Sequence, residues 1–116
     1  MRVLILQAGN SYVDVYRASV SWKGTKYQIR ESERITFDGR VSTPKKHLIG
    51  RVIRWVNERS DSGVKVAILP GKTLTPLLLK RIKERTLFIE LLQPQYEDPD
   101  TTLKHMARHI RDSLSP

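Results

Sequence analysis

The chain has no cysteine, few aromatic residues and no long apolar run, and each absence excludes a class of protein. Without cysteine there are no disulfides and no thiolate metal sites, which agrees with a reducing compartment. The apolar runs are far too short to span a bilayer, and the start of the chain does not have the pattern of a secretory signal. With 116 residues, 39% of them hydrophobic, we expect a single soluble cytoplasmic domain over residues 1–116 and no membrane partner.

Acidic residues are also scarce. The chain has 12 of them against 21 basic residues, a formal net charge of +9. Residues 1–60 hold 12 basic and 5 acidic residues, which gives +7, and residues 61–116 hold 9 and 7, which gives +2. An excess of positive charge favours a polyanionic partner, and nucleic acid is the commonest one. A basic protein whose charge only keeps it soluble is the alternative interpretation.

The segment 43–59 combines an apolar side and a basic side on one predicted helix. Thr43 is a suitable N-cap and Pro44 suits the first helical position. At about 100° per residue, one half of the helix is apolar: Leu48, Ile49, Val52, Ile53, Trp55 and Val56. The other half carries Lys46, His47, Arg51 and Arg54. We predict that the apolar half packs on the core, and that the contacts to a nucleic-acid backbone come from Arg17, Lys46, Arg51 and Arg54.

Hydrophobic periodicity predicts five strands and three helices. The strands are expected at residues 2–8, 12–22, 27–37, 64–69 and 86–92, and the third is weakened by the charged run 30–34. The helices are expected at 44–58, from Thr75 onward, and from the Asp98-Pro99 start to about Leu114. The order β-β-β-α-β-α-β-α predicts an α/β fold, a mixed sheet whose first three strands form an antiparallel meander. The later strands are expected to be parallel neighbours with right-handed crossovers.

This order of elements resembles the ribonuclease H-like fold. The nucleases of that fold hold metal ions with carboxylates on the first strand, on the first helix and after the fourth strand. The corresponding regions here offer Gln7, His47, Ile49, Leu69 and Pro70, none of them acidic. The resemblance therefore implies a non-catalytic or differently catalytic relative, because two-metal hydrolysis needs carboxylates to hold the ions. We assign no catalytic residue and no cofactor.

Two loops form a second candidate site. Residues 70–73 end in the Gly-Lys-Thr of a phosphate-binding loop, but Val66 stands where the full motif needs its first glycine. If the first and fourth strands are parallel neighbours, loops 9–11 and 70–75 meet at the carboxyl edge of the sheet, where α/β proteins bind ligands. An anion such as a nucleotide would then be bound by Asn10, Ser11, Lys72 and Thr73. Ligand-sensing domains for cyclic oligonucleotides are loosely similar, and two ordinary turns are the alternative.

The remaining histidines and aromatic residues have both structural and functional interpretations. His105 and His109 have the i, i+4 spacing of two metal ligands, but no third ligand is evident, so we assign no metal site. Tyr12 and Tyr16 alternate with cations and are suited either to stacking on bases or to cross-strand packing. We expect Trp22 and Trp55 to lie in the core.

Three functions are consistent with these patterns. The first is a nucleic-acid-binding accessory domain that uses the basic helix face. The second is a sensor or enzyme that binds a nucleotide or cyclic oligonucleotide, a small phosphorylated ligand, at loops 9–11 and 70–75. The third is a protein-interaction or homo-oligomerisation domain with an incidental charge, whose largest apolar patch is expected on the last helix.

Overall fold

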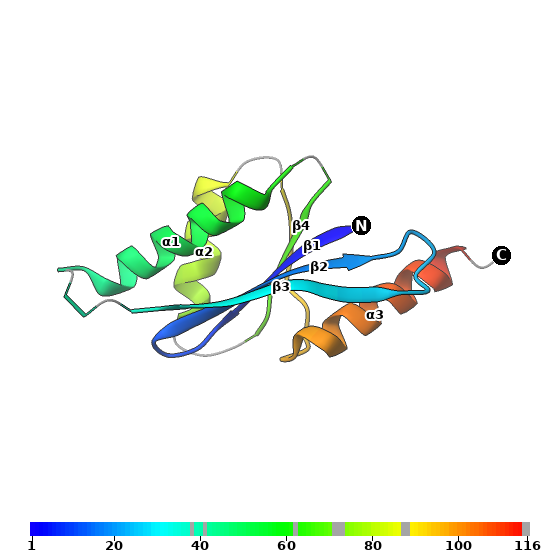
Figure 1. Ribbon diagram of the computed structural model, residues 1–116, viewed down its shortest axis with the longest axis horizontal. Helices are drawn as coiled ribbons and strands as arrows, with labels where there is room; N and C mark the ends of the chain where they lie inside the picture. Colours follow the sequence, from blue (N-terminus) through cyan, green and yellow to red (C-terminus); the bar gives the residue numbers. More distant parts are fainter. Residues whose placement is uncertain (38, 41, 62, 71–73, 87–88, 115–116) are drawn as a thin grey trace.

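The computed structural model describes residues 1–37, 39–40, 42–61, 63–70, 74–86 and 89–114. A mixed five-stranded sheet forms the centre of the molecule, with α1 and α2 on one face and α3 on the other (Figure 1). The strands are β1 (Arg2–Ala8), β2 (Tyr12–Val20), β3 (Tyr27–Thr36), β4 (Lys65–Ile68) and β5 (Glu90–Leu92). The helices are α1 (Pro44–Arg59), α2 (Thr75–Arg85) and α3 (Pro99–Leu114).

The strand order is β3-β2-β1-β4-β5. β1 pairs antiparallel with β2, and β2 pairs antiparallel with β3, so the first three strands form the predicted meander. β1 pairs in parallel with β4, and β4 pairs in parallel with β5, through the helical crossovers. The predicted α/β architecture and the predicted element order are confirmed.

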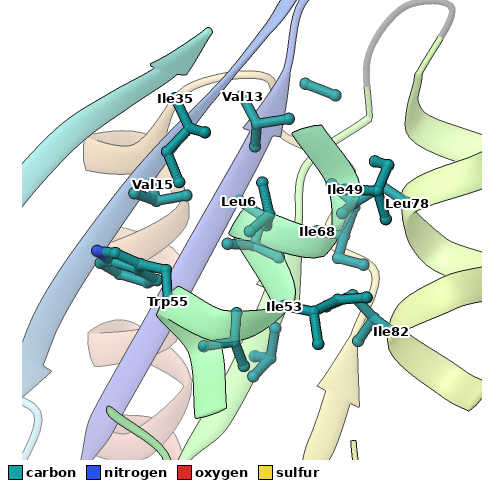
Figure 2. Packing of buried hydrophobic residues seen from close by; sticks show 14 of the residues in the cluster. Leu6, Val13, Val15, Ile35, Ile49, Ile53, Trp55, Ile68, Leu78 and Ile82 are labelled. Carbon is teal, nitrogen blue, oxygen red and sulfur yellow. The ribbon is translucent and has the colours of Figure 1, made fainter. Parts of the chain in front are cut away.

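The larger part of the core lies between the sheet and the pair α1 and α2. All six apolar residues of the predicted α1 stripe are buried. They pack on the odd-numbered face of β2, where Val13 and Val15 point toward the helix, and on Leu78 and Ile82 of α2 (Figure 2). Trp55 belongs to this cluster, as predicted. Because most of this stripe is covered by packing, the surface that α1 presents to solvent is mainly its polar side.

A second core cluster lies between the opposite face of the sheet and α3. It contains Ala18 and Val20 of β2 together with Leu103 and Ala107 of α3. The apolar pattern of β2 thus changes face along the strand, because α1 covers one end of the strand and α3 covers the other, on opposite sides (Figure 1). This change explains the shift in periodicity near residue 17.

β3 is a continuous strand of ten residues, although the charged run 30–34 predicted a weakened one. The strand tolerates this run because it forms the edge of the sheet, where charged side chains reach water. Cross-strand ion pairs also support it: Arg34 binds Asp14, and Glu31 binds Arg17. The register between β2 and β3 shifts between Arg17 and Ala18.

The helix starts agree only in part with the predicted caps. Asp98 caps α3, since its carboxylate accepts a hydrogen bond from the Thr101 amide at 2.7 Å. Thr43 is the N-cap residue of α1, but its side chain makes no capping hydrogen bond. The N-cap of α2 is Leu74, and Thr75 lies inside the helix. Among the described residues, no helix has the length and apolar character needed to cross a membrane.

Candidate functional site

The outer surface of α1 carries the predicted basic side chains. Lys46, Arg51 and Arg54 are all exposed. Arg51 donates a hydrogen bond to the carbonyl oxygen of Thr36 at 3.3 Å, which ties it to the end of β3. Lys46 and Arg54 form no hydrogen bond or ion pair with any residue that the structure describes. Their positive charges are therefore available to a partner.

A groove of about 610 Å³ runs between α1 and α2. Its wall is apolar, with Ile49 and Ile53 from α1 and Leu77 from α2. Its rim is basic, with four cations contributed by the two helices: Lys45, Lys46, Arg81 and Arg85. None of the described residues that line this groove is acidic, although Arg81 also binds Glu84 beside it at 3.2 Å. Folding thus places the basic side of α1 next to a second basic helix, α2, although the two helices are far apart in the sequence. This junction was not part of the sequence-based prediction.

The opposite edge of the α1 surface meets β3. A smaller hollow of about 180 Å³ there is lined by Arg51 and Arg54 together with two acids, Glu33 and Glu58. Acidic residues therefore partly offset the positive charge of α1 on the side toward β3. On the side toward α2, the described residues that line the groove include no acid to offset it. Lys46 and the groove rim therefore form a cationic surface without an acidic residue among the described residues that line it.

Arg17 lies apart from this surface, in an ion-pair network. It binds Glu31 at 3.3 Å, and Glu31 also accepts a hydrogen bond from Arg59 Nε at 2.9 Å. The Arg59 guanidinium lies 4.2 Å from the centre of the Trp55 ring. Hydrogen bonds from Arg59, supported by Arg17, hold the pKa of Glu31 below its ordinary value. Arg17 thus has a structural partner, in contrast to Lys46 and Arg54.

The strand-edge site is only partly described. β1 and β4 are parallel neighbours, and the Leu69 amide donates to the Leu6 carbonyl oxygen at 2.9 Å, so both loops follow strands that end at one edge of the sheet. Asn10 and Ser11 are exposed there. Lys72 and Thr73 lie outside the described residues, and the convergence of all four side chains on an anion stays a prediction.

The positions that correspond to metal ligands in ribonuclease H-like nucleases do not fit metal ions. Gln7 uses its amide to donate to the Glu97 carbonyl oxygen at 2.6 Å, Leu69 is buried and apolar, and His47 is exposed on α1. Asp14 pairs with Gln7 in the sheet register, but Arg34 binds both of its carboxylate oxygens, at 2.8 and 3.0 Å. Across the described part of the chain, no group of three His, Cys, Asp or Glu side chains could hold a metal ion.

The two histidines of α3 lie in a hollow of about 450 Å³ beside β5. His105 stacks on Tyr96, with ring centroids 4.1 Å apart and an angle of 8° between the ring planes. His109 is exposed on the next turn. The stacking of His105 is a packing interaction and explains its position without a ligand.

Of the aromatic residues of the meander, Tyr12 and Tyr16 make packing contacts, one of their two predicted interpretations, whereas Trp22 differs from its prediction. Tyr12 is half-buried, with the Arg34 guanidinium 3.9 Å from its ring centre, and Tyr16 packs on the α3 core cluster. Burial and the neighbouring Asp14 charge raise the pKa of Tyr16. The prediction that Trp22 lies in the core is wrong, because its exposed fraction is 72%. β2 ends at Val20, so Trp22 belongs to the turn, and the Lys-Gly-Thr sequence directly after it was the available signal.

No model of a known protein family matches this chain, and no curated protein has a sequence similar enough to count as a relative. Solved structures do match. RuvC of Thermus thermophilus has a TM-score of 0.55 at 16% identity, over 97% of this chain and 80% of RuvC. T. thermophilus RuvC in complex with Holliday junction substrate has a TM-score of 0.52 at 14% identity, over 100% of this chain and 82% of RuvC. A Ppx/GppA family member from Aquifex aeolicus follows with a TM-score of 0.46 at 17% identity, over 81% of this chain and 35% of that one.

The two RuvC matches establish the class of fold. The chain has a ribonuclease H-like fold, as its element order predicted. At such low identities the likeness concerns the backbone alone, so a function has to be derived from the side chains of this chain.

Proposed function

We propose that this protein binds nucleic acid through the basic surface of α1 and its groove with α2, without cleaving it by two-metal chemistry. The observation that carries the proposal is the groove rim, where Lys45, Lys46, Arg81 and Arg85 surround an apolar wall that contains no acidic residue among those described. Cations spaced along two helices match the regular negative charge of a phosphate backbone. The apolar wall suits the sugars and bases that accompany those phosphates.

The outer arc of α1 extends this surface. Lys46 lies at the groove rim, and Arg54 and Arg51 continue the positive charge toward β3. α1 has no acidic residue in its first turn, so the partial positive charge of the helix N-terminus adds to that of the lysines. RuvC, which has the same fold, has been solved with Holliday junction substrate, and branched DNA therefore belongs among the partners to test.

The absence of carboxylates at the expected positions supports binding rather than metal-dependent cleavage. Gln7 is held by a backbone carbonyl, and Asp14, the carboxylate paired with it in the sheet, is bound by Arg34. A carboxylate whose oxygens both accept bonds from an arginine is poorly placed to hold a metal ion.

The test is a binding titration with labelled single-stranded DNA, duplex DNA, four-way junction DNA and RNA at about 50 and 200 mM salt. We expect binding that weakens steeply with salt, because each phosphate contact releases a condensed counterion. Absence of binding to all four at the lower salt concentration would refute the proposal.

A small phosphorylated ligand is the second candidate, and the groove volume favours it. About 610 Å³ lies within the range of small-molecule sites, and an apolar wall with a cationic rim suits a nucleotide. Mononucleotides and cyclic dinucleotides are therefore added as competitors. Saturable binding of one of them, with no affinity for long polymers, would select this candidate over the first.

A further inference from the structure

The tip of the β2–β3 hairpin presents a tryptophan to solvent. Trp22 follows the end of β2 and is 72% exposed, and Tyr27 at the start of β3 is 41% exposed. Large aromatic side chains are normally covered on folding, because burying them contributes strongly to stability. The apolar surface of an exposed tryptophan is therefore available to a binding partner. Tryptophan is also enriched among the interface residues that contribute most of the binding free energy.

The turn that carries Trp22 is tightly built. The Ser21 amide donates to the Lys26 carbonyl oxygen, and the Gly24 amide donates to the Ser21 carbonyl oxygen, both at 2.9 Å. The hydroxyl oxygen of Ser21 accepts hydrogen bonds from the amides of Thr25 and Lys26, each at 3.0 Å. Ser21 takes part in all four of these hydrogen bonds, which hold the turn together.

The same turn packs closely against α3. Gly24 is buried and has a φ of +69°, and a Cβ at this position would overlap the carbonyl oxygen of Ala107. Figure 1 shows the hairpin tip lying along the C-terminal half of α3. Because hydrogen bonds and the contact with α3 hold the turn in one conformation, we expect Trp22 to lose little backbone freedom when a partner binds it.

The surroundings of Trp22 are cationic. The Lys23 ammonium group lies 4.8 Å from the centre of the Trp22 ring. Lys26 and Arg30 line an adjacent hollow of about 540 Å³ together with Tyr27, and none of the described residues lining that hollow is acidic. Exposed aromatic rings between cations are the combination that binds unpaired nucleotides, in which bases stack and phosphates pair with positive charge.

We propose that this hairpin tip, formed by Trp22, Lys23, Lys26 and Tyr27, binds unpaired bases of a nucleic acid. Trp22 stacks on one base, and Lys23 and Lys26 contact the flanking phosphates. The inference rests on the proposed function, to which it adds a preference for single-stranded or locally unpaired segments. α1 packs on Val13 and Val15, near the start of β2, whereas the tip follows the other end of β2 and lies against α3 on the opposite face of the sheet, so the tip is a contact separate from the α1 surface.

The experiment compares the wild type with Trp22→Ala and Trp22→Phe. The probes are a single-stranded oligonucleotide and an abasic oligomer with the same number of phosphates. We expect Trp22→Ala to weaken binding of the base-containing strand about 5- to 100-fold, with the salt dependence unchanged, and Trp22→Phe to restore much of the affinity. The wild type should bind the abasic strand more weakly than the normal one.

Tryptophan fluorescence supplies an independent readout. The protein has two tryptophans, and Trp55 is 5% exposed, so a difference in quenching between the wild type and Trp22→Phe reports on Trp22. Saturable quenching that disappears in Trp22→Phe supports the stacking contact. Circular dichroism checks that each variant retains its fold.

The failure of this inference differs from the failure of the proposed function. One outcome overturns the hairpin inference alone: Trp22→Ala binds the base-containing strand as tightly as the wild type does, and the wild type binds the abasic strand equally well, while variants of the α1 surface bind more weakly. The protein would then still bind nucleic acid. Trp22 would then belong to a protein-binding surface. If no strand binds at low salt, the proposed function and the inference fail together.

Discussion

Two exposed cations on α1 provide the sharpest test of the proposed nucleic-acid surface. Lys46 and Arg54 lie on the outer arc of the helix and form no bond with any other described residue. The variant Lys46→Ala/Arg54→Ala therefore removes charge without breaking an interaction that holds the fold together. Surface substitutions of this kind change the free energy of unfolding by about 0.5 kcal/mol or less. Arg51 is less suitable for this test, because its hydrogen bond to Thr36 would be lost as well.

The expected magnitude follows from counterion release. For duplex DNA, each phosphate contact contributes about 0.9 to the slope of log affinity against log salt, so the loss of two contacts lowers the slope by about 1.8. Between about 50 and 200 mM salt, that difference corresponds to a roughly 12-fold change in the affinity ratio of wild type to variant. Fluorescence anisotropy at four or five salt concentrations measures both the affinity and the slope.

The matched control is Lys104→Ala/Arg108→Ala on α3. These two cations are also exposed and lie on one helix. That helix packs on the face of the sheet opposite α1, so they lie far from the α1 surface. Both double variants lower the formal net charge from +9 by two, to +7. On duplex DNA, for which no contact with the hairpin tip is proposed, we expect the α3 variant to keep the slope of the wild type. An equal loss in both variants would show that net charge alone drives binding, and an unchanged slope in the α1 variant would refute the assigned surface.

Three further predictions concern stability. Gly24→Ala should lower the free energy of unfolding by about 1–3 kcal/mol in chemical denaturation, because the residue has a positive φ and its new methyl group would overlap the backbone of Ala107. An unchanged midpoint would contradict the close approach of the hairpin to α3. Leu48→Ala should lower the free energy of unfolding by about 2–5 kcal/mol, since Leu48 is fully buried on the side of α1 that packs on the core. Glu31→Gln should destabilise the protein at neutral pH. Arg59 lowers the pKa of Glu31 in the folded state, so its contribution is present above the ordinary glutamate pKa of about 4.3 and disappears as the pH falls through the lower folded value. Melting temperatures of wild type and variant should therefore converge at acid pH, and a constant difference would refute this explanation.

Much of the fold could be predicted because the signals are local. The six apolar residues of α1 recur at helical spacing, and all of them are buried. Asp98 stands before Pro99, and it caps α3. β1 reads as a short apolar run and lies in the middle of the sheet, where both of its faces are covered. In each case the residues that determine the element lie within a few positions of one another.

The errors arose where a distant element decides the environment. Trp22 reads as a core residue because it continues the alternation of β2, but β2 ends before it and α3 packs on the turn instead. The charged run in β3 reads as a break, but the strand continues because Arg17 and Asp14 of the neighbouring strand bind its charges. A single sequence does not show which residues will be opposite these side chains.

By itself, the sequence determined the strands and helices, the ribonuclease H-like order and the excess of positive charge, since these depend on residue type and on periodicity. Only the tertiary structure decided how the charge is arranged. It brings Lys46 to Arg81 across a groove, pairs Arg17 with Glu31, and leaves Trp22 uncovered at a hairpin tip. The physical reason is that the availability of a side chain to a partner depends on what packs beside it, and those neighbours come from parts of the chain that only folding brings together.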